Sequence, residues 1–405
     1  MLSIPLLPLR NRSAMIRIGK TGQLLRIAFM TRGMYPGGVE TYMLRLGNYL
    51  QQNGCSVDVV TTVEPGPWFD KISEMKLGAY NWAPRGVFRG RYRMHAAHIG
   101  LSLALRSYDA VFLNHESYAQ HSLCLLPGRS VAVSVLHNNH EQIYGVAEEN
   151  SDLWNVAVAV SKKVDETFRH RVPSRPVIYI PYGVPSPKAV ELARRRPHGL
   201  PFRLVFIGRI FEAKGVLLLP ELVRKCLARG LDVKLTLAGG GPEREAVEAI
   251  SERFGIADRL EFLGTISPEA VYPLLLDSHV NLLPSFYEGF PLVLLEAQAC
   301  GCVPVATRMP GITDISIQEG RTGLLCDAGD VDGFANAIAE LCQSRTQWTK
   351  MSLSGRDYVA ESFSIDRMGE AYLKLIRDSV GQMYNLPRSR WRAFPRSLFS
   401  PVILP

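Results

Sequence analysis

The chain has 405 residues, 47% hydrophobic and 21% charged, which fits a globular protein too long for one ordinary core. Its seven irregularly spaced cysteines argue against a disulfide framework and for a reducing compartment such as the cytoplasm. No apolar window of about 18 residues occurs, so no segment is expected to cross a membrane. The apolar run in residues 1–12 lacks a preceding basic region and makes a poor signal peptide; Met15 is an alternative start.

The charge is unevenly distributed along the chain. Residues 1–200 carry 24 Lys and Arg against 14 Asp and Glu, whereas residues 201–380 carry 18 against 24. This distribution suggests that the first half faces something anionic. No zinc-finger, helix-turn-helix or RNP-type pattern is present, so nucleic acid is not the expected partner. An anionic membrane surface or a phosphorylated lipid fits the charge as well.

Short apolar runs alternate with amphipathic stretches in the first half. We expect buried strands at residues 24–31, 55–62, 108–114, 130–138, 156–161 and 177–184. A helix should follow the first strand, because apolar residues recur at helical spacing from Val39 to Leu50. This alternation predicts a parallel, doubly wound α/β sheet.

The pattern is interrupted at residues 185–201, which contain four prolines and an arginine triplet and are predicted to be a linker. The alternation then restarts, with strands expected at 202–208, 232–239, 260–264, 280–285 and 303–307. The predicted organisation is an extension at 1–23, a first domain at 24–184, a second at 202–355, a helix crossing back at 356–380, and a basic aromatic tail at 381–405. Two such domains leave a ligand cleft at the carboxyl ends of their strands.

Two cations follow the first strand of the second domain, in the sequence "IGRIFEAKG". Gly208 allows the backbone to turn, while Arg209 and Lys214 stand at the mouth of the expected crevice. A planar guanidinium and a compact ammonium group together suit a diphosphate. An ordinary solvated loop is the alternative interpretation.

A second motif, "EGFPLVLLEAQACG", combines two carboxylates with a helix start. Pro291 fits the first helical position and Gly301 the stop, which places Glu288 in the preceding turn and Glu296 inside the helix. The amides of Gly289 and Phe290 would form an anion site, and carboxylates accept hydrogen bonds from sugar hydroxyls. These features together indicate a sugar nucleotide.

The chain resembles the retaining glycosyltransferase family 4, which has the GT-B fold of two Rossmann-like domains facing each other across a cleft. The resemblance covers roughly residues 25–380 and rests on six motifs in the family's order. They are "PGGVETYMLRLGNYL", "VAVS" with "IPYGV", "GRIFEAKG", "GGGPERE", "DRLEFLG" and the E-x7-E motif "EGFPLVLLEAQACG".

The resemblance implies a role for each matching residue. Arg209, Lys214 and Gly208 would hold the donor diphosphate, Glu296 the ribose hydroxyls, and Glu288 the donor sugar near the reacting centre. The remaining implied site residues are Gly289, Phe290 and Pro291 through their backbone, Gly37 and Gly38 near the diphosphate and acceptor, Leu263 beside the base, and His137 against the donor sugar. No cofactor and no metal are implied.

Three further patterns are ambiguous. His140 is a rival to His137 for the histidine role, because the segment "HNNH" departs from the family pattern. The D-x-D sequence of Asp330 and Asp332 has the look of a metal site, but helix capping is the interpretation that we favour. Cys300 and Cys302 are interpreted as core residues rather than metal ligands.

The basic and aromatic stretch at residues 85–107 suggests contact with an anionic bilayer or a lipid-diphosphate acceptor, although a solvated helix face explains it equally well. The predicted function is transfer of a sugar from a UDP- or GDP-sugar to a glycan or lipid-linked acceptor, in polysaccharide, lipopolysaccharide or glycolipid assembly. The expected location is the cytoplasm, peripheral to the membrane. A sugar-nucleotide epimerase and a catalytically silent sugar-nucleotide-binding partner are the alternatives.

Overall fold

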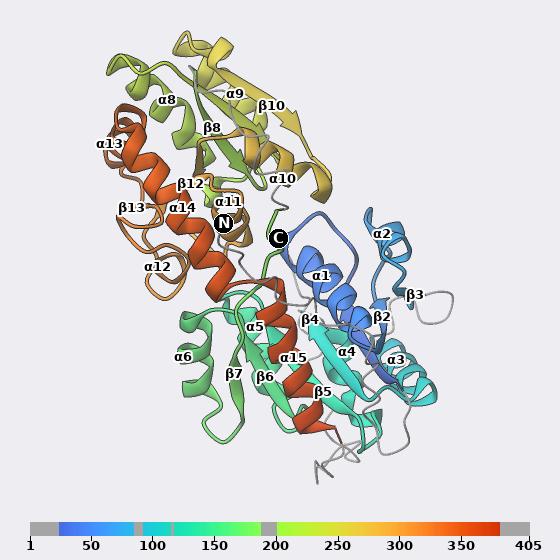
Figure 1. The fold of residues 1–405 in the computed structure, drawn as a ribbon. Coiled ribbons are helices and arrows are strands. Elements are labelled where there is room, and N and C mark those ends of the chain that lie inside the picture. The colour runs from blue at the N-terminus through green and yellow to red at the C-terminus, as the bar shows by residue number, and fades with distance from the viewer. Residues whose placement is uncertain (1–23, 85–91, 115–116, 188–200, 381–405) are drawn as a thin grey trace, which may run out of the picture.

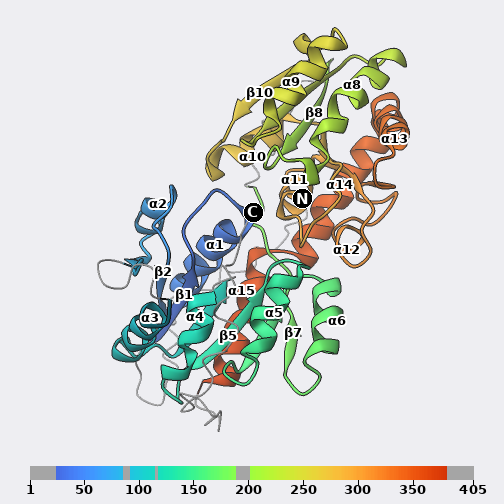
Figure 2. The same ribbon diagram turned by 180° about the vertical axis from the view of Figure 1, so that it is seen from behind.

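The computed structural model describes residues 24–84, 92–114, 117–187 and 201–380. The predicted extension at 1–23, the tail at 381–405, most of the predicted linker and the arginines of 85–91 lie outside these residues. Within them the chain forms two bodies, each built on a parallel β-sheet with helices packed against it (Figures 1 and 2).

The first sheet has seven parallel strands in the order β3-β2-β1-β4-β5-β6-β7. Their bounds are β1 Leu25–Thr31, β2 Cys55–Thr61, β3 Gly78–Asn81, β4 Ala110–Asn114, β5 Val131–Leu136, β6 Val156–Ala159 and β7 Val177–Tyr179. The helices of this body are α1 Gly38–Gln52, α2 Phe69–Glu74, α3 Tyr92–Arg106, α4 Ser117–Ser122, α5 Glu141–Glu149 and α6 Lys162–Arg171. Every residue of β4, β5 and β6 is buried, because helices cover both faces of the sheet.

The second sheet has six parallel strands in the order β10-β9-β8-β11-β12-β13. Their bounds are β8 Phe202–Ile207, β9 Val233–Ala238, β10 Leu260–Gly264, β11 Val280–Leu283, β12 Val303–Thr307 and β13 Leu324–Cys326. The helices are α8 Leu219–Ala228, α9 Arg244–Arg253, α10 Pro268–Asp277, α11 Leu292–Ala299, α12 Thr313–Ser316, α13 Val331–Gln343, α14 Arg345–Ser362 and α15 Ile365–Ser379. A short 3-10 turn at Glu212–Lys214 follows β8.

Both sheets begin with the same strand order, three-two-one-four-five-six, which is the doubly wound Rossmann order. The order reverses between β1 and β4 in the first sheet and between β8 and β11 in the second. Ligands of open α/β sheets bind at the carboxyl ends of the strands beside such a reversal. The predicted fold class is confirmed, and each predicted strand is present; β3 and β13 were not predicted.

The chain passes between the two bodies twice, near Val184 and near Phe363, and these two passages lie side by side. Val184 donates its backbone N–H to the carbonyl of Phe363 at 2.8 Å, and Ile365 donates to the carbonyl of Val184 at 3.0 Å. The helical stretch predicted near 356–380 is divided in the structure, because α14 ends at Ser362 and α15 begins at Ile365. Helix α14 packs on α11, whereas α15 packs along α1 in the first body (Figure 1).

Buried apolar side chains continue from one body into the other. Phe290 and Leu295 of the second body belong to the same core cluster as Tyr42 and Leu46 of α1 and Tyr372 of α15. The two bodies therefore share one continuous apolar core.

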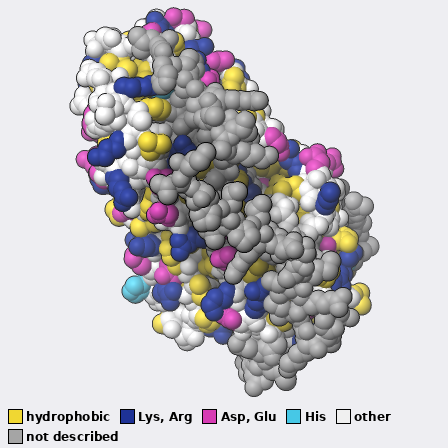
Figure 3. Space-filling model, in the orientation of Figure 1, with side chains coloured by type: hydrophobic (Ala, Val, Ile, Leu, Met, Phe, Trp, Pro, Cys, Tyr) yellow, Lys and Arg dark blue, Asp and Glu magenta, His cyan; other side chains and the backbone are white. Residues whose placement is uncertain are grey.

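Two surface features bear on the sequence analysis. On the part of the surface visible in Figure 3, Lys and Arg side chains lie among Asp and Glu over both bodies. In the described part of the chain, no helix combines the length and the apolar character that spanning a membrane requires.

Candidate active site

The loop between β11 and α11 holds Glu288 in a turn, as predicted, with its side chain largely buried. Lys214 Nζ lies 2.7 Å from each of the two carboxylate oxygens, and Ser285 Oγ donates to Oε1 at 2.8 Å. The loop is fastened to the 3-10 turn, because Phe286 donates its N–H to the carbonyl of Ala213 at 2.9 Å. The sequence thus brings together a cation and a carboxylate that are 74 residues apart.

The chain must approach itself closely to make this pair. Gly215 adopts a φ of +67°, and a Cβ at that position would lie 2.0 Å from the carbonyl oxygen of Pro284. Only glycine satisfies both constraints. The "AKG" end of the motif therefore positions Lys214 beside the β11–α11 loop.

Arg209 follows β8 at the same edge of the sheet and is exposed. It has no ion pair with any residue in the described ranges. The neighbouring Gly208 donates its N–H to the carbonyl of Ala238 at 3.0 Å, and a Cβ at Gly239 would lie 1.8 Å from the Gly208 carbonyl oxygen. The triple-glycine turn thus packs against Gly208, next to the exposed Arg209.

The first body presents the start of α1 to this edge. Gly37 caps the helix in an extended conformation, and its carbonyl accepts hydrogen bonds from Thr41 N at 3.1 Å and Thr41 Oγ1 at 2.8 Å. A Cβ at Gly37 would lie 2.7 Å from Glu40 Oε2, whereas a Cβ at Gly38 would meet open space. The predicted glycine turn is therefore partly filled by a carboxyl group.

Glu40 is the carboxyl group that fills the turn. Burial raises the pKa of Glu40 to about 7, although backbone hydrogen bonds and the charge of Arg209 act in the opposite direction. The sequence analysis did not single out Glu40, because a glutamate in the first turn of a helix is common.

His137 lies at the carboxyl end of β5 and is 2% exposed. Its Nδ1 lies 2.6 Å from the hydroxyl of Tyr182, and its Nε2 lies 2.8 Å from Oδ1 of Asn114. A Cβ at Gly289 would lie 2.2 Å from the His137 carbonyl oxygen. The backbone of His137 therefore touches the loop of Glu288, while both ring nitrogens face partners in the first body.

His140, the rival histidine, is exposed. It caps α5, accepting a hydrogen bond from Gln142 N at 3.3 Å, and its ring centroid lies 6.4 Å from that of Tyr287. Tyr287 belongs to the same loop as Glu288. Both histidines therefore contact the β11–α11 loop, one through its backbone and one through its ring.

Helix α11 differs from the prediction by one position at its start. Pro291 is the residue before the helix, which begins at Leu292, and Gly301 with a φ of +65° follows its end. Phe290 is 5% exposed and packs against the rings of Tyr182 and Phe363. Its side chain is therefore part of the core, and only its backbone can line a ligand site.

Glu296 lies inside α11 as predicted, but its partner was not predicted. Arg45 Nη2, from α1, donates to Glu296 Oε1 at 2.6 Å. Arg45 lies among the buried residues Tyr42, Met43 and Leu46, and a charged residue in such a run is the only signal that the sequence offered. A pairing over 251 residues cannot be read from local pattern.

Leu263 lies near the end of β10 and is 43% exposed, so its side chain can contact a ligand. The described contacts do not join it to the other site residues. Among the described site residues, Lys214 bonds to Glu288 and Gly289 approaches the backbone of His137, so these two contacts share one loop. Gly37 approaches Glu40, and Glu296 bonds to Arg45.

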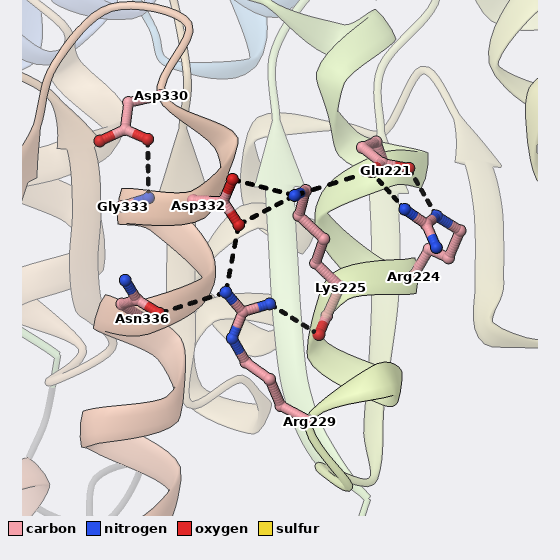
Figure 4. Close-up of polar contacts among 8 residues, drawn as sticks. All are labelled: Glu221, Arg224, Lys225, Arg229, Asp330, Asp332, Gly333 and Asn336. Carbon is pink, nitrogen blue, oxygen red and sulfur yellow. Dashed lines mark hydrogen bonds and ion pairs between the residues drawn. The ribbon is translucent and has the colours of Figure 1, made fainter.

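The D-x-D sequence stands at the start of α13, where Asp332 is part of an ion-pair network (Figure 4). Asp330 accepts a hydrogen bond from Gly333 N at 2.9 Å and caps the helix, as predicted. Asp332 bonds to Lys225 Nζ at 2.8 Å and to Arg229 at 3.1 Å. Both carboxylates thus have partners within the second body.

In the described part of the chain, the pair Cys300 and Cys302 lies in the apolar core. Cys300 and Cys302 are fully buried in an apolar cluster with Leu275, which confirms that they are core residues. No group of three or more His, Cys, Asp or Glu side chains that could hold a metal ion occurs among the described residues.

Comparison with known protein families shows to which family the chain belongs. Residues 36–186 match the family described as "Glycosyltransferase Family 4", and residues 193–357 match "Glycosyl transferases group 1". The chain belongs to this glycosyltransferase family. The two matches meet near the predicted linker, and together they include both ends of the E-x7-E motif and the glycine turn of α1.

Individual relatives match over parts of their length. D-inositol 3-phosphate glycosyltransferase of Corynebacterium jeikeium is 35% identical over 38% of this chain and 39% of that protein. The lipopolysaccharide core biosynthesis glycosyltransferase LpsE of Rhizobium meliloti is 29% identical over 57% of this chain and 62% of that protein. The chain thus matches less than two thirds of the length of either relative.

The fold also matches solved structures. HepE of Anabaena, solved in complex with UDP and glucose, superimposes with a TM-score of 0.74 over 87% of this chain and 99% of that one, at 16% sequence identity. This similarity confirms the GT-B fold.

Proposed function

We propose that the protein is a retaining glycosyltransferase that moves a sugar from a UDP- or GDP-sugar to a glycan or lipid-linked acceptor. The observation that carries the proposal is the arrangement at the reversal of the second sheet. There the exposed guanidinium of Arg209, which has no ion pair among the described residues, and the partly buried pair of Lys214 and Glu288 lie at the carboxyl ends of β8 and β11. The UDP and glucose named for HepE support a nucleotide-sugar donor.

The chemistry requires stabilisation of two developing charges. As the bond between the anomeric carbon and the diphosphate breaks, negative charge builds on the leaving group and positive charge on the sugar ring. In our proposal Arg209, Lys214 and the first amides of α11 stabilise the diphosphate, without a metal ion. The backbone of Gly208, Gly37 and Gly38 would approach the same group.

Glu288 acts on the sugar in this proposal. Lys214 and Ser285 hold its carboxylate in place through hydrogen bonds, so that it can orient sugar hydroxyls and stabilise the positive ring. We assign it an orienting and electrostatic role rather than that of a nucleophile. The leaving phosphate would take the proton of the acceptor hydroxyl, which is consistent with retention of configuration.

The remaining site residues have proposed roles around this centre. Glu296 would bind the ribose hydroxyls, Leu263 the base, and His137 the donor sugar, while Gly289, Phe290 and Pro291 would line the sugar through their backbone. We propose a role in cell-surface polysaccharide, lipopolysaccharide or glycolipid assembly at the cytoplasmic face of the membrane. The similarity to LpsE, which is named as a lipopolysaccharide core biosynthesis glycosyltransferase, supports this proposal.

The proposal is tested by measuring release of UDP or GDP from a panel of nucleotide sugars, with and without lipid extracts or oligosaccharides as acceptors. We expect release that depends on an acceptor, persists in EDTA and is lost in Glu288→Gln. Formation of an epimeric nucleotide sugar without acceptor would identify an epimerase instead. Tight nucleotide binding without turnover for every donor and acceptor would support a silent binding partner.

A further inference from the structure

The ion pair between Arg45 and Glu296 joins the two bodies at the helix that carries the proposed ribose ligand. Arg45 belongs to α1 of the first body, and Glu296 belongs to α11 of the second. Their side chains are 14% and 8% exposed, and Nη2 and Oε1 lie 2.6 Å apart. The contact is therefore shielded from water, unlike the ion pair of Lys71 with Glu269 between the same bodies.

The surroundings of Arg45 hold its guanidinium in place. Its central carbon lies 5.7 Å from the centroid of the Tyr272 ring, a distance compatible with a cation–π contact. The hydroxyl of Tyr272 in turn donates to the carbonyl of Pro185 at 2.9 Å, at the crossing between the bodies. The guanidinium of Arg45, which pairs with Glu296, is thus held by residues at the junction between the two bodies.

Stability alone is a poor explanation for this arrangement. A buried ion pair recovers little more than its desolvation cost, and apolar residues of similar volume often do as well. Nη1 of Arg45 is also buried and has no hydrogen-bond partner in the described part of the chain. A guanidinium left partly unsatisfied costs further free energy, so the pair is not built for stability.

We infer that Arg45 is a positioning residue of the donor site, which holds Glu296 by one carboxylate oxygen so that the other accepts hydrogen bonds from the ribose diol. This inference rests on the proposed function, in which Glu296 binds ribose. It adds a residue of the first body to the recognition of the nucleotide. Because the pair spans both bodies, ribose recognition also depends on how they face each other.

The test compares the affinities of UDP and 2′-deoxy-UDP by calorimetry, with GDP and 2′-deoxy-GDP in parallel. We expect the wild-type protein to prefer the ribonucleotide. Arg45→Met should weaken its binding about tenfold and abolish the preference, whereas Arg45→Lys should restore part of both. In a Glu296→Gln background, Arg45→Met should have no further effect.

A matched control comes from a second ion pair between the bodies. Lys71 of α2 lies 3.3 Å from Glu269 of α10, with side chains 21% and 69% exposed. Lys71→Met should therefore leave both affinities unchanged. Because the preference is a ratio, a partly unfolded Arg45 variant does not distort it.

The outcomes separate this inference from the proposed function. If Arg45→Met keeps the affinity and the preference while Glu296→Gln loses them, Arg45 has no positioning role. Tighter binding in Arg45→Met would show that the pair obstructs the site, which also overturns the inference. A folded wild-type protein that binds none of the four nucleotides would refute the proposed function, and the inference with it.

Discussion

The ammonium group of Lys214 lies 2.7 Å from both carboxylate oxygens of Glu288, across the edge of the second sheet. In the proposed donor site, this contact brings together two groups with different proposed roles. Glu288 would act on the sugar, and Lys214, bonded to both oxygens of that carboxylate, would reach the diphosphate from a position that the carboxylate sets.

The two partners should therefore respond differently to substitution. Glu288→Gln keeps the volume of the side chain and releases Lys214, so UDP or GDP should bind at least as tightly as before. Transfer should nevertheless fall by about 100-fold or more, because the charge that stabilises the sugar is lost. Lys214→Ala should weaken nucleotide binding by about 1.5–3 kcal/mol. Calorimetry and turnover measurements on both variants check this, and weaker nucleotide binding in Glu288→Gln would contradict it.

The two histidines near the loop can be distinguished by a matched pair of alanine variants. His137→Ala leaves the partners Tyr182 and Asn114 without their hydrogen bonds, at a cost of about 1–3 kcal/mol each, so the melting temperature should fall. We also expect kcat per nucleotide-binding site to fall about tenfold or more. His140→Ala removes a helix cap and should change kcat less than about twofold. The reverse order of the kcat effects would transfer the proposed role to His140.

The raised pKa of Glu40 predicts that the stability of the protein depends on pH. Burial raises its pKa in the folded protein to about 7 from an ordinary value of 4.5, with Arg209 opposing the shift. The folded state therefore binds the proton of the Glu40 carboxyl more tightly than the unfolded state does. The resulting contribution to the free energy of unfolding is complete below pH 4.5 and is lost as the pH rises to about 7. Relative to the wild-type protein, Glu40→Gln should melt at a progressively higher temperature between pH 5 and pH 8. A difference that is constant over this range would show that the carboxyl is not held protonated.

Helix α3 gives the membrane proposal a testable surface. Met94, Leu101 and Leu105 are 40%, 57% and 85% exposed, and Arg93 beside them is exposed too. If this face enters an anionic bilayer, the protein should float with vesicles containing phosphatidylglycerol and not with neutral vesicles. Replacing the three apolar residues with glutamine should abolish flotation. Equal binding to both kinds of vesicle would contradict the proposal.

The sequence predicted the fold well because its strands are strongly patterned. The runs that became β4, β5 and β6 are apolar throughout, as parallel strands covered on both faces must be. The missed strand β3 consists of four half-buried residues, Gly78–Asn81, without that signal. The break between α14 and α15 was also missed, although Ser364 caps the second helix by accepting a hydrogen bond from Arg367 N at 3.3 Å.

The positions of the site residues could be predicted from the sequence only where a motif or a turn residue identifies them. Glu288 and Lys214 lie in the turns in which the motifs placed them, and Asp330 caps its helix. Arg45 could not be predicted, because its meaning depends on a partner 251 residues away in the other body. The ring of His137 was expected in the cleft, but its burial depends on two tertiary contacts that no local pattern encodes.

The most direct test of the central claim is calorimetric titration of the wild-type protein with UDP and GDP in the absence of metal. Arg209→Ala and Glu296→Ala should be measured beside it, with Arg253→Ala, an exposed residue at the far end of α9, as the control. We predict micromolar binding of one nucleotide, weakened at least tenfold in the first two variants and unchanged in the control. Absence of binding to either nucleotide by the folded protein would contradict the proposed donor site.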